Sequence, residues 1–389
     1  MPSWSNWSGK LTATPSRIEF LRSEAHAAAL TKAATDNGER VRVVGAAHSH
    51  APLVRHDGII ADPQALAGVI STDLATQSAW VAAGTRVYAL GPALLDAGLG
   101  LLNQGDIDQQ AISGATATGT HGTGVGLRNL SAAVIGARIA LANGELVDCS
   151  ANDQPELWQA SRLHLGAFGV VTRLHLQLSH AYRLKEASWQ AGLDEVLASF
   201  HADAVKHRHL EFFWYPHTDV AQGKSIDVTD DSPVYPLAEE GARCAWSFEV
   251  LPNHRPHKHT EMEYSVPASN GPACMAAIRD LLKNTFTDVR WPVEYRTLAA
   301  DDVWMSTAYA QDTVTISVHQ DVREDDEPYF RACEDIFLEF DGKPHWGKVN
   351  YLDRDQLAAR HPRWDDWWRV RDQVDPNGTF LNDYLETIR

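Results

Sequence analysis

The spacing of apolar residues along the chain predicts strands and helices in alternation over the first part of the sequence. Apolar runs of roughly four to eight residues, bounded by glycine, proline or polar clusters, are typical of buried strands, whereas apolar residues three or four positions apart are typical of helices. Strands are predicted at 41–44, 58–63, 79–85, 132–140 and 169–178. Helices are predicted at 23–37, 87–96 and 157–162, the first two closed by Gly38 and Gly98.

The pattern changes beyond about residue 178, where alternating apolar and polar stretches become more prominent. These stretches predict strands at 210–215, 244–250 and 314–318. Helices are predicted at 271–284 and 329–340, and the polar, proline-containing stretch 223–236 is predicted to be a loop. A chain of 389 residues exceeds one compact core. We therefore expect an α+β protein of two domains, the second of which adds another sheet with helices.

The composition is that of an ordinary globular protein, with 44% hydrophobic and 22% charged residues. No apolar run is long enough to span a membrane, and the N-terminus lacks the pattern of a secretory signal, so no membrane contact and a cytoplasmic location are expected. The four cysteines form no CxxC pair and are expected to be reduced thiols. The net charge of −17 argues against nucleic-acid binding and favours a neutral or small substrate.

Two segments with small residues suggest the walls of a cofactor site. In residues 43–50, an apolar run ends on the turn Gly45-Ala46-Ala47, and His48 stands at the mouth of that turn. Residues 113–124 offer backbone N–H groups, hydroxyls and His121 with little side-chain bulk, which suits phosphate and ring contacts. Taken singly, the histidine could be a surface residue and the second segment a flexible loop. Neither segment is a Walker loop or a GxGxxG fingerprint, which disfavours a nicotinamide Rossmann fold.

Further along the chain, charged residues stand in apolar surroundings. Glu294 and Arg296 are two positions apart in an alternating stretch, so they project from the same face of a strand. The segment 342–348 places Lys348 after an aromatic turn. A surface ion pair and an ordinary loop are the alternative interpretations.

Histidines cluster at three places in the sequence, which makes these places candidate metal sites. The clusters are His48/His50, His207/His209 and His254/His257/His259. None of the clusters is part of an HExxH or CxxC motif, which is the ligand spacing typical of a metal centre, so no metal is predicted.

Several motifs in order identify a family resemblance that covers nearly the whole chain. They are residues 45–49, 118–122 and 165–171, the Glu294-x-Arg296 pair, residues 345–348 and residues 375–385. With these motifs the chain resembles the vanillyl-alcohol-oxidase superfamily of flavoproteins, in the branch of sugar-1,4-lactone (arabinono/gulonolactone) oxidases and alditol oxidases. The resemblance implies a two-subdomain FAD-binding domain of the PCMH type at 1–178 and an α+β substrate-binding cap at 179–341. It also implies that 342–389 returns to the FAD domain and the active site.

The resemblance also implies FAD as the cofactor and assigns residues to it. His48 matches the histidine that bonds the flavin 8α-methyl group, which makes the flavin a stronger oxidant and prevents its loss; His121 is the next candidate. The residues that match the pyrophosphate wall are Gly45, Ala46, Ala47 and Ser49. Those that match the opposite wall are Gly114, Thr118, Thr120, His121 and Gly122. Val170 or Val171 matches a backbone contact to the flavin or adenine end.

For the chemistry, Glu294 and Arg296 match the pair that positions substrate hydroxyls in the family. Lys348 matches a lysine near the flavin N1–C2=O edge, where a cation stabilises the reduced flavin. His319 stands at a plausible spacing for a base or a flavin contact.

One departure from the family concerns Gly105 and Asp106, where relatives commonly have a small residue followed by serine. Asp106 can only accept a hydrogen bond when it is ionised, whereas serine would donate one to a substrate hydroxyl. In this family glycine at the first position goes with oxidases and alanine with dehydrogenases, so Gly105 favours oxygen as acceptor. The alternative is a turn residue that needs a positive φ.

These observations predict an FAD-dependent oxidase that acts on a CH–OH group of an aldono-1,4-lactone of the arabinono or gulono type. A hydride would pass to flavin N5, and molecular oxygen would become hydrogen peroxide. Two alternatives within the enzymes are an alditol oxidase of the xylitol or sorbitol type and a dehydrogenase that uses a dye, a quinone or a cytochrome. A flavin- or sugar-binding protein without turnover is disfavoured by the intact His48, Glu294, Arg296 and Lys348.

Overall fold

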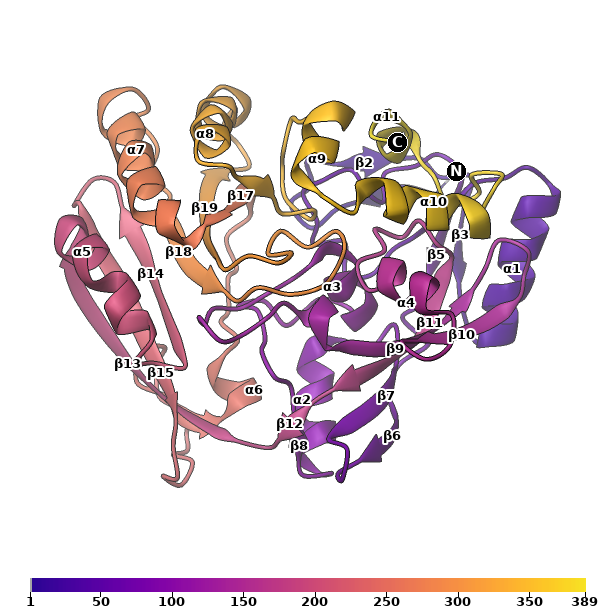
Figure 1. The fold of residues 1–389 in the computed structure, drawn as a ribbon, viewed down its shortest axis with the longest axis horizontal. Coiled ribbons are helices and arrows are strands. Elements are labelled where there is room, and N and C mark those ends of the chain that lie inside the picture. The colour runs from indigo at the N-terminus through magenta and orange to yellow at the C-terminus, as the bar shows by residue number, and fades with distance from the viewer. Residues whose placement is uncertain (1) are drawn as a thin grey trace.

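The computed structural model of the protein describes residues 2–389 as two regions that lie side by side (Figure 1). The region coloured indigo to magenta holds a three-stranded sheet, a five-stranded sheet and two short two-stranded ribbons, and the region coloured pink to orange holds one large sheet. The yellow C-terminal helices lie over the first region, near the N-terminus. Within residues 2–389, a helix with the length and apolar character needed to cross a bilayer is absent.

The first region begins with a ribbon of two short strands and a parallel sheet of three strands. The ribbon pairs β1 (Trp4–Ser5) with β2 (Thr12–Ala13). The parallel sheet has the order β3 (Arg17–Phe20), β5 (Ile59–Asp62) and β4 (Val41–Val43). Helix α1 (Glu24–Asp36) packs on this sheet through alanine and leucine. It begins where the Ser23 side chain accepts a hydrogen bond from the His26 N–H, and Gly38 follows its end with φ +67°.

The second sheet of this region has five antiparallel strands. Their order is β10 (Leu146–Ser150), β9 (Val134–Ala140), β11 (Val170–Gln177), β7 (Ser78–Ala82) and β6 (Val69–Asp73). The helices around it are α2 (Val87–Leu95), α3 (Ile112–Thr118) and α4 (Pro155–Ser161), and a 3₁₀ turn (Leu130–Ala133) leads into β9. The short strands β8 (Leu99–Gly100) and β12 (Ser179–His180) pair beside it. Strand β11 therefore joins two halves of a sheet whose other strands come from residues 69–150.

The third sheet has eight antiparallel strands. Their order is β16 (Cys244–Trp246), β13 (Arg183–Gly192), β15 (Val220–Val228), β14 (His209–Tyr215), β18 (Val293–Leu298), β19 (Thr313–Asp321), β17 (His259–Pro267) and β20 (Lys343–Pro344). Its helical elements are α5 (Leu193–Ala204), α6 (Ser247–Val250), a 3₁₀ turn (Ala268–Asn270), α7 (Gly271–Asn284) and α8 (Glu327–Glu339).

The two faces of the third sheet differ because side chains alternate along each strand. One face carries large apolar side chains that pack on α5, α7 and α8; for example, Phe212 meets Phe200 at 5.5 Å and Tyr264 stacks on Phe337 at 4.9 Å between ring centroids. The opposite face carries buried polar side chains. We call it the polar face, and its central residues are Glu261, Glu263, Glu294, Arg296 and Ser317.

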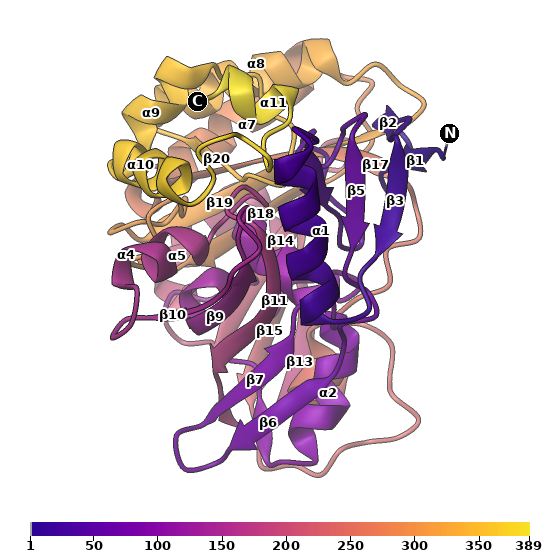
Figure 2. The same ribbon diagram turned by 90° about the vertical axis from the view of Figure 1, so that its right-hand side faces the viewer.

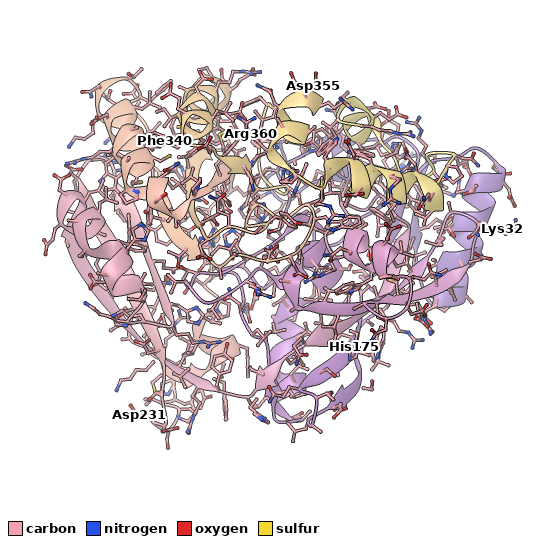
Figure 3. The ribbon with its side chains drawn as sticks, in the orientation of Figure 1. Lys32, His175, Asp231, Phe340, Asp355 and Arg360 are labelled. Atoms are coloured by element: carbon pink, nitrogen blue, oxygen red, sulfur yellow. The ribbon has the colours of Figure 1, made fainter. Side chains whose placement is uncertain are left out.

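The C-terminal helices α9 (Arg354–Arg360), α10 (Trp364–Val374) and α11 (Asp383–Thr387) follow the third sheet and return to the first region (Figure 2). Arg360, labelled in Figure 3, donates from Nε to the Gly342 carbonyl at 3.1 Å and so ties α9 to the segment before β20. The Trp367 indole donates to the Leu163 carbonyl at 3.0 Å.

Arg42 of β4 holds the C-terminal segment against the first region. Its guanidinium is buried and donates to four carbonyl oxygens, those of Leu53, Leu165, Gly166 and Phe380. The N–H of the neighbouring residue, Val41, donates to the Thr379 carbonyl at 2.7 Å. Residues near position 380 are thus built into the N-terminal sheet.

Two predicted segments differ from the structure. The predicted loop 223–236 begins instead as strand, because β15 continues to Val228. The glycine at 223 leaves room for the ring of Trp189 on the paired strand, since an added Cβ would lie 2.0 Å from that ring.

The second difference lies at 244–250, which was predicted to be a strand throughout. Strand β16 ends at Trp246, and the short helix α6 follows. The Glu249 carboxylate accepts a hydrogen bond from the Trp246 N–H at 3.2 Å, which closes a helical turn that an alternating pattern does not reveal.

Candidate active site and cofactor site

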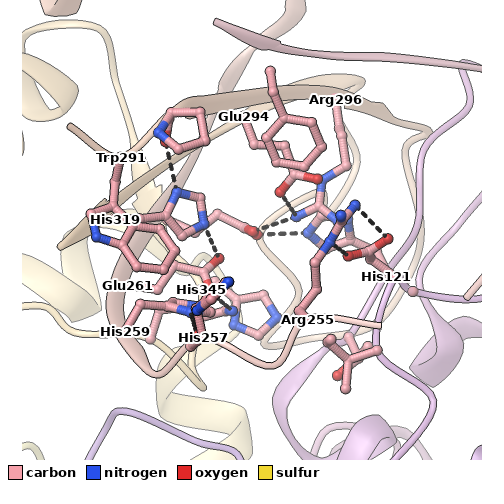
Figure 4. A pocket seen from close by; sticks show the side chains of 18 of the residues that line it. His121, Arg255, His257, His259, Glu261, Trp291, Glu294, Arg296, His319 and His345 are labelled. Carbon is pink, nitrogen blue, oxygen red and sulfur yellow. Dashed lines mark hydrogen bonds and ion pairs between the residues drawn. The ribbon is translucent and has the colours of Figure 1, made fainter. Parts of the chain in front are cut away.

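A cavity of about 500 Å³ lies between the polar face and the loops of the first region. Strands β17, β18 and β19 line one side of it, and residues between Gly105 and His121 line the other, together with the segment that follows β20. Figure 4 shows Glu294, Arg296 and His319 reaching into the same space as His121. Sheet, loop and C-terminal segment therefore converge on one site.

The centre of the site is a chain of buried polar contacts across three strands. Glu294, Ser317 and Glu263 lie directly opposite one another on β18, β19 and β17. Arg296 bridges the outer two, with Nη2 at 3.2 Å from Glu294 Oε2 and 2.7 Å from Glu263 Oε2. The predicted sharing of a face by Glu294 and Arg296 is confirmed. The surface ion pair is wrong, because both residues are at most 7% exposed.

The two carboxylates beside Arg296 differ in protonation. Burial raises the pKa of Glu294 to about 8, against the effect of Arg296 and with the help of nearby carboxylates. Burial also disfavours the charged form of Glu263, but His121 and Arg296 hold the pKa of Glu263 well below the ordinary value. At neutral pH the site thus offers a neutral carboxyl group at Glu294 and an anion at Glu263.

Lys348 is also part of this cavity, and its ammonium group is not isolated. It pairs with the Glu261 carboxylate, which lies 3.7 Å from Nε2 of both His259 and His319. Although burial opposes it, Lys348 and these histidines hold the pKa of Glu261 well below the ordinary value. Lys348 and Glu261 therefore form a pair with no net charge.

His319 is a neutral imidazole with one open nitrogen. Its Nδ1 donates to the Pro292 carbonyl at 2.9 Å, so the proton of the neutral ring is on Nδ1 and Nε2 carries the lone pair. Burial lowers the pKa of His319 to about 4. The sequence placed this residue after a strand, whereas it lies within β19 and lines the cavity.

A second cavity of about 80 Å³ adjoins the first, and Gln110 lines both. We call its small-residue lining the cradle, formed by residues 45–49 together with Gly114 and Thr118 of α3. Helix α3 replaces the flexible loop considered for this segment. A Cβ added at Gly114 would meet no atom within 4 Å, so the cavity reaches the backbone there.

The cradle fits a pyrophosphate group. Within residues 2–389, the backbone N–H groups of Gly45 to Ser49 donate no hydrogen bond to a protein acceptor. Ala47 has φ +56°, and successive residues that alternate between right- and left-handed conformations turn their N–H groups into an anion-binding concavity. These free donors, with the absence of side-chain bulk, match the requirements of a dinucleotide cofactor.

His48 lies at the junction of the cradle and a further groove of about 620 Å³. Its ring stacks on Trp7 with the centroids 5.3 Å apart. Burial lowers the pKa of His48 to about 4, and Lys348 adds to this effect. The imidazole is therefore neutral and keeps a nucleophilic nitrogen.

The other residues predicted for the cofactor separate into three environments. Thr120 and His121 line the 500 Å³ cavity rather than the cradle. At Gly122 an added Cβ would lie 2.2 Å from the Gln104 carbonyl, so close backbone approach explains the glycine. Val170 and Val171 are buried in β11, where they pair with β9 and line neither cavity.

Gly105 and Asp106 stand at the rim of the 500 Å³ cavity. Gly105 does not have a positive φ, so its interpretation as a strained turn residue is wrong. An added Cβ there would lie 3.1 Å from the His121 carbonyl oxygen. The Asp106 carboxylate accepts hydrogen bonds from the Asn253 side-chain amide and from Arg255, whose Nε lies 2.8 Å away.

The histidine clusters weighed as metal sites separate in space. His207 pairs with Asp227 at 2.6 Å, and His209 donates to the Thr123 carbonyl. His50 and His259 do approach Glu261, with the ligand atoms of the three within 4.8 Å of one another. The Glu261 carboxylate is already ion-paired with the ammonium group of Lys348.

Sequence reasoning missed the residues of β17, above all Glu261 and Glu263. The signal was present, because polar residues at 259, 261, 263 and 265 alternate with apolar residues at 262, 264 and 266. His345 was also missed as a separate contributor, although its motif was noted; it lines the cavity with its ring centroid 5.8 Å from that of His121.

Comparison with solved structures identifies the class of fold. The crystal structure of cholesterol oxidase from B. sterolicum matches with a TM-score of 0.85 over 99% of this chain and 96% of that chain, at 17% identity. At that identity the match speaks for the fold alone. The predicted α+β fold with an FAD-binding domain is confirmed, since residues 15–150 match the FAD binding domain.

Comparison of sequences identifies the family. The model of D-arabinono-1,4-lactone oxidase matches residues 174–246 and 236–388. L-gulono-1,4-lactone dehydrogenase of Mycobacterium tuberculosis is 35% identical over 100% of this chain and 99% of its own. L-gulonolactone oxidase of Bos taurus is 25% identical over 91% of each. The chain belongs to the D-arabinono-1,4-lactone oxidase family within the vanillyl-alcohol-oxidase superfamily.

Proposed function

We propose that this protein oxidises a CH–OH group of an aldono-1,4-lactone of the arabinono or gulono type, with FAD as cofactor and oxygen as acceptor. In this proposal residues 1–178 bind the cofactor, residues 179–341 supply the substrate-binding sheet, and residues 342–389 return to the site. When bound, FAD supplies a two-electron acceptor for hydride from carbon. The names of the relatives support the substrate class.

The roles of the site residues follow from their protonation. The Arg296 guanidinium donates to substrate oxygens, and the neutral Glu294 carboxyl both donates to and accepts from a hydroxyl. His319 Nε2 takes the proton of the hydroxyl under oxidation, because its lone pair faces the cavity. The Glu261 carboxylate, 3.7 Å from that nitrogen, stabilises the imidazolium that forms.

The cradle holds the cofactor pyrophosphate through the free N–H groups of residues 45–49, with Gly114 and Thr118 on the other side. We further propose that His48 is the covalent attachment point to the flavin 8α-methyl group. Its neutral ring, its freedom from protein hydrogen-bond partners among residues 2–389 and its place beside the cradle support this assignment.

Oxygen as acceptor is supported by Gly105, which leaves open the space that a methyl group would take beside His121 and Thr120. The two relatives differ on this point, since one is named a dehydrogenase and the other an oxidase. In the oxidase reaction, the hydride and the hydroxyl proton removed from the lactone reduce molecular oxygen to hydrogen peroxide.

The observation that carries the proposal is the pairing of the Glu294–Arg296 set with the open Nε2 of His319 across one cavity. The test is anaerobic mixing of the purified holoenzyme with D-arabinono-1,4-lactone, L-gulono-1,4-lactone and xylitol, while the flavin absorbance is followed. Rapid bleaching by a lactone and slow bleaching by xylitol is the expected result. Preferential bleaching by xylitol would make the protein an alditol oxidase, and no bleaching by any of the three contradicts the proposal.

Acid precipitation of the same preparation tests the attachment. Colour retained in the wild-type pellet and lost from the pellet of His48→Ala is expected. Colour that remains in the His48→Ala pellet would move the attachment to another residue, with His121 as the next candidate.

A further inference from the structure

The ring of His121 is held between two oxygen acceptors. Its Nδ1 lies 2.8 Å from the Gly122 carbonyl oxygen, and its Nε2 lies 2.7 Å from Glu263 Oε1. A carbonyl oxygen can only accept, so Nδ1 carries a proton. The state of the ring then depends on which atom holds the proton between Nε2 and Glu263.

The other contacts of Glu263 decide that question. Its Oε2 accepts from Arg296 Nη2 and from Ser317 Oγ, both at 2.7 Å. The carboxylate is 1% exposed, so these donors and His121 replace its water shell. An anion with a cation on each side is the stable arrangement, and it leaves the shared proton on Nε2.

Other histidines of the cavity are bonded differently. His345 Nδ1 accepts the Gly347 N–H at 3.0 Å, so that nitrogen is unprotonated and the ring is neutral. His319 donates from one nitrogen only. Among residues 2–389, His121 is the histidine whose two ring nitrogens both lie within hydrogen-bond distance of a carbonyl or carboxylate oxygen.

We propose that His121 is a lasting imidazolium, and that the buried group His121–Glu263–Arg296 supplies the net positive charge of the cavity. This group holds two cations around one carboxylate, and the neighbouring Glu294 is neutral. The pair Lys348–Glu261 has no net charge. Glu263 is accordingly a positioning residue that joins the cofactor-side wall to the substrate-binding arginine.

The consequence for the cofactor rests on the proposed function. Hydride transfer adds two electrons and one proton to a flavin, so the ring system gains one negative charge. A cation fixed in a site shielded from water stabilises such a charge without reorganisation. The sequence assigned this role to Lys348; the proposal gives it to His121, because the charge of Lys348 is matched by that of Glu261.

Nitrogen-15 NMR of the apoprotein, labelled at histidine, tests the protonation without any cofactor. The His121 signals are assigned by their loss in His121→Gln. We expect both ring nitrogens to carry protons, because each lies within hydrogen-bond distance of an oxygen acceptor. The groups that face the ring are Glu263, Arg296 and His345, and the His345 signals should report a neutral ring throughout.

Two variants sharpen this measurement. Glu263→Gln should convert His121 to the neutral ring at neutral pH, while Ser317→Ala should leave it charged because only a neutral donor is lost. A neutral His121 signal at pH 7 in the wild type overturns the proposal. A neutral signal that responds to Zn²⁺ and to a chelator also overturns it, in favour of a metal held by His121, Glu263 and His345.

The midpoint potential of the holoenzyme tests the cofactor part. His121→Gln should weaken binding of the reduced relative to the oxidised flavin by about tenfold, which is about 30 mV for a two-electron couple. His345→Gln, a neutral-for-neutral exchange in the same cavity, should leave the ratio unchanged. An unchanged potential in His121→Gln overturns the cofactor part, whereas failure of the lactone to bleach the flavin overturns only the proposed function.

Discussion

The cradle and the polar face form two walls of one cleft, and they offer opposite kinds of chemistry. Apart from the ring of His48, the cradle presents backbone N–H groups from residues 45–49 and only small side chains. The polar face presents buried charges, such as Glu263 and Arg296, that touch one another at 2.7 Å. The difference teaches that binding at the cradle depends on the small volume of its residues, whereas the chemistry at the polar face depends on the charge of its residues. Each of the following changes tests one side of that contrast.

Gly114→Leu should have the largest effect, and it acts by volume alone. The added side chain meets no protein atom within 4 Å of its Cβ, so the apoprotein should fold and gain roughly 0.5–1 kcal/mol from replacing a helical glycine. It fills the cofactor space, so FAD affinity should fall by about 4 kcal/mol, or a thousandfold.

Thermal melting of the apoprotein and the flavin-to-protein absorbance ratio measure the two effects of Gly114→Leu. Gly192→Leu is the control, because its Cβ also meets nothing within 4 Å but lies at the start of α5, outside the cavities. A Gly114→Leu protein that is as yellow as the control would remove Gly114 from the cofactor site.

Glu294→Gln keeps the shape of the side chain but removes its titration, so it should change how stability depends on pH. The pKa of Glu294 is raised to about 8, so between about pH 4 and pH 8 the folded protein keeps a proton that the unfolded chain has lost. Wild-type stability contributed by this group therefore falls as pH rises through that window and is level above it.

Glutamine has no such proton, so Glu294→Gln should gain stability relative to wild type by on the order of 3 kcal/mol between pH 5 and pH 8. Urea unfolding of both apoproteins across that range measures the difference. If the unfolding free energies of the two proteins change with pH in parallel, Glu294 is already ionised in the folded state.

Arg296→Lys keeps the charge of the polar face and changes only its shape. Nη2 of Arg296 already serves both Glu263 and Glu294, and a lysine ammonium group in its place would lack the other planar guanidinium donors that remain for the substrate. Loss of one hydrogen bond to a charged group is worth about 1.5–3 kcal/mol, so KM for the lactone should rise roughly 10- to 100-fold, with a smaller change in kcat. An unaltered KM would place substrate binding elsewhere on the polar face.

Gly105→Ala should have the smallest effect and acts where the two walls meet. The new methyl group lies 3.1 Å from the His121 carbonyl and 3.3 Å from Thr120 Cγ2, a tight fit that small shifts relieve. One methyl group in a confined space is worth about tenfold, so reoxidation by oxygen should slow about tenfold. Stopped-flow mixing measures both half-reactions, and equal slowing of the anaerobic half would point to a general distortion of the site.

Much of the fold was readable from the sequence because the elements follow simple periodicities. Strands β4, β5, β9 and β11 are apolar runs, and α1, α7 and α8 have helical spacing, so all were predicted within a few residues. Segments whose structure depends on a distant partner were not predicted. Residues 223–228 join the sheet because their neighbour β13 supplies a tryptophan ring over a glycine.

The site shows the same division. Glu294 and Arg296 were predicted as site residues because two charges share an apolar strand, and residues 45–49 were predicted as a cofactor wall because their small residues are contiguous. Glu263 escaped because its importance comes from His121, 142 positions away, and from Arg296 on another strand. Its role depends on register between strands, which a single sequence does not specify.

The carbonyl contacts of Arg42 bear on whether the cofactor-binding part could be moved to another protein. The sequence match to an FAD binding domain ends at residue 150, but Leu165, Gly166 and Phe380 supply acceptors to Arg42 from beyond it. Strand β11, which joins β9 to β7, also lies outside that match. A fragment of residues 15–150 would leave a buried guanidinium short of acceptors and a sheet split in two. The limits of sequence similarity are not limits of folding here, so an exchange of this domain must carry the C-terminal segment along with the N-terminal one.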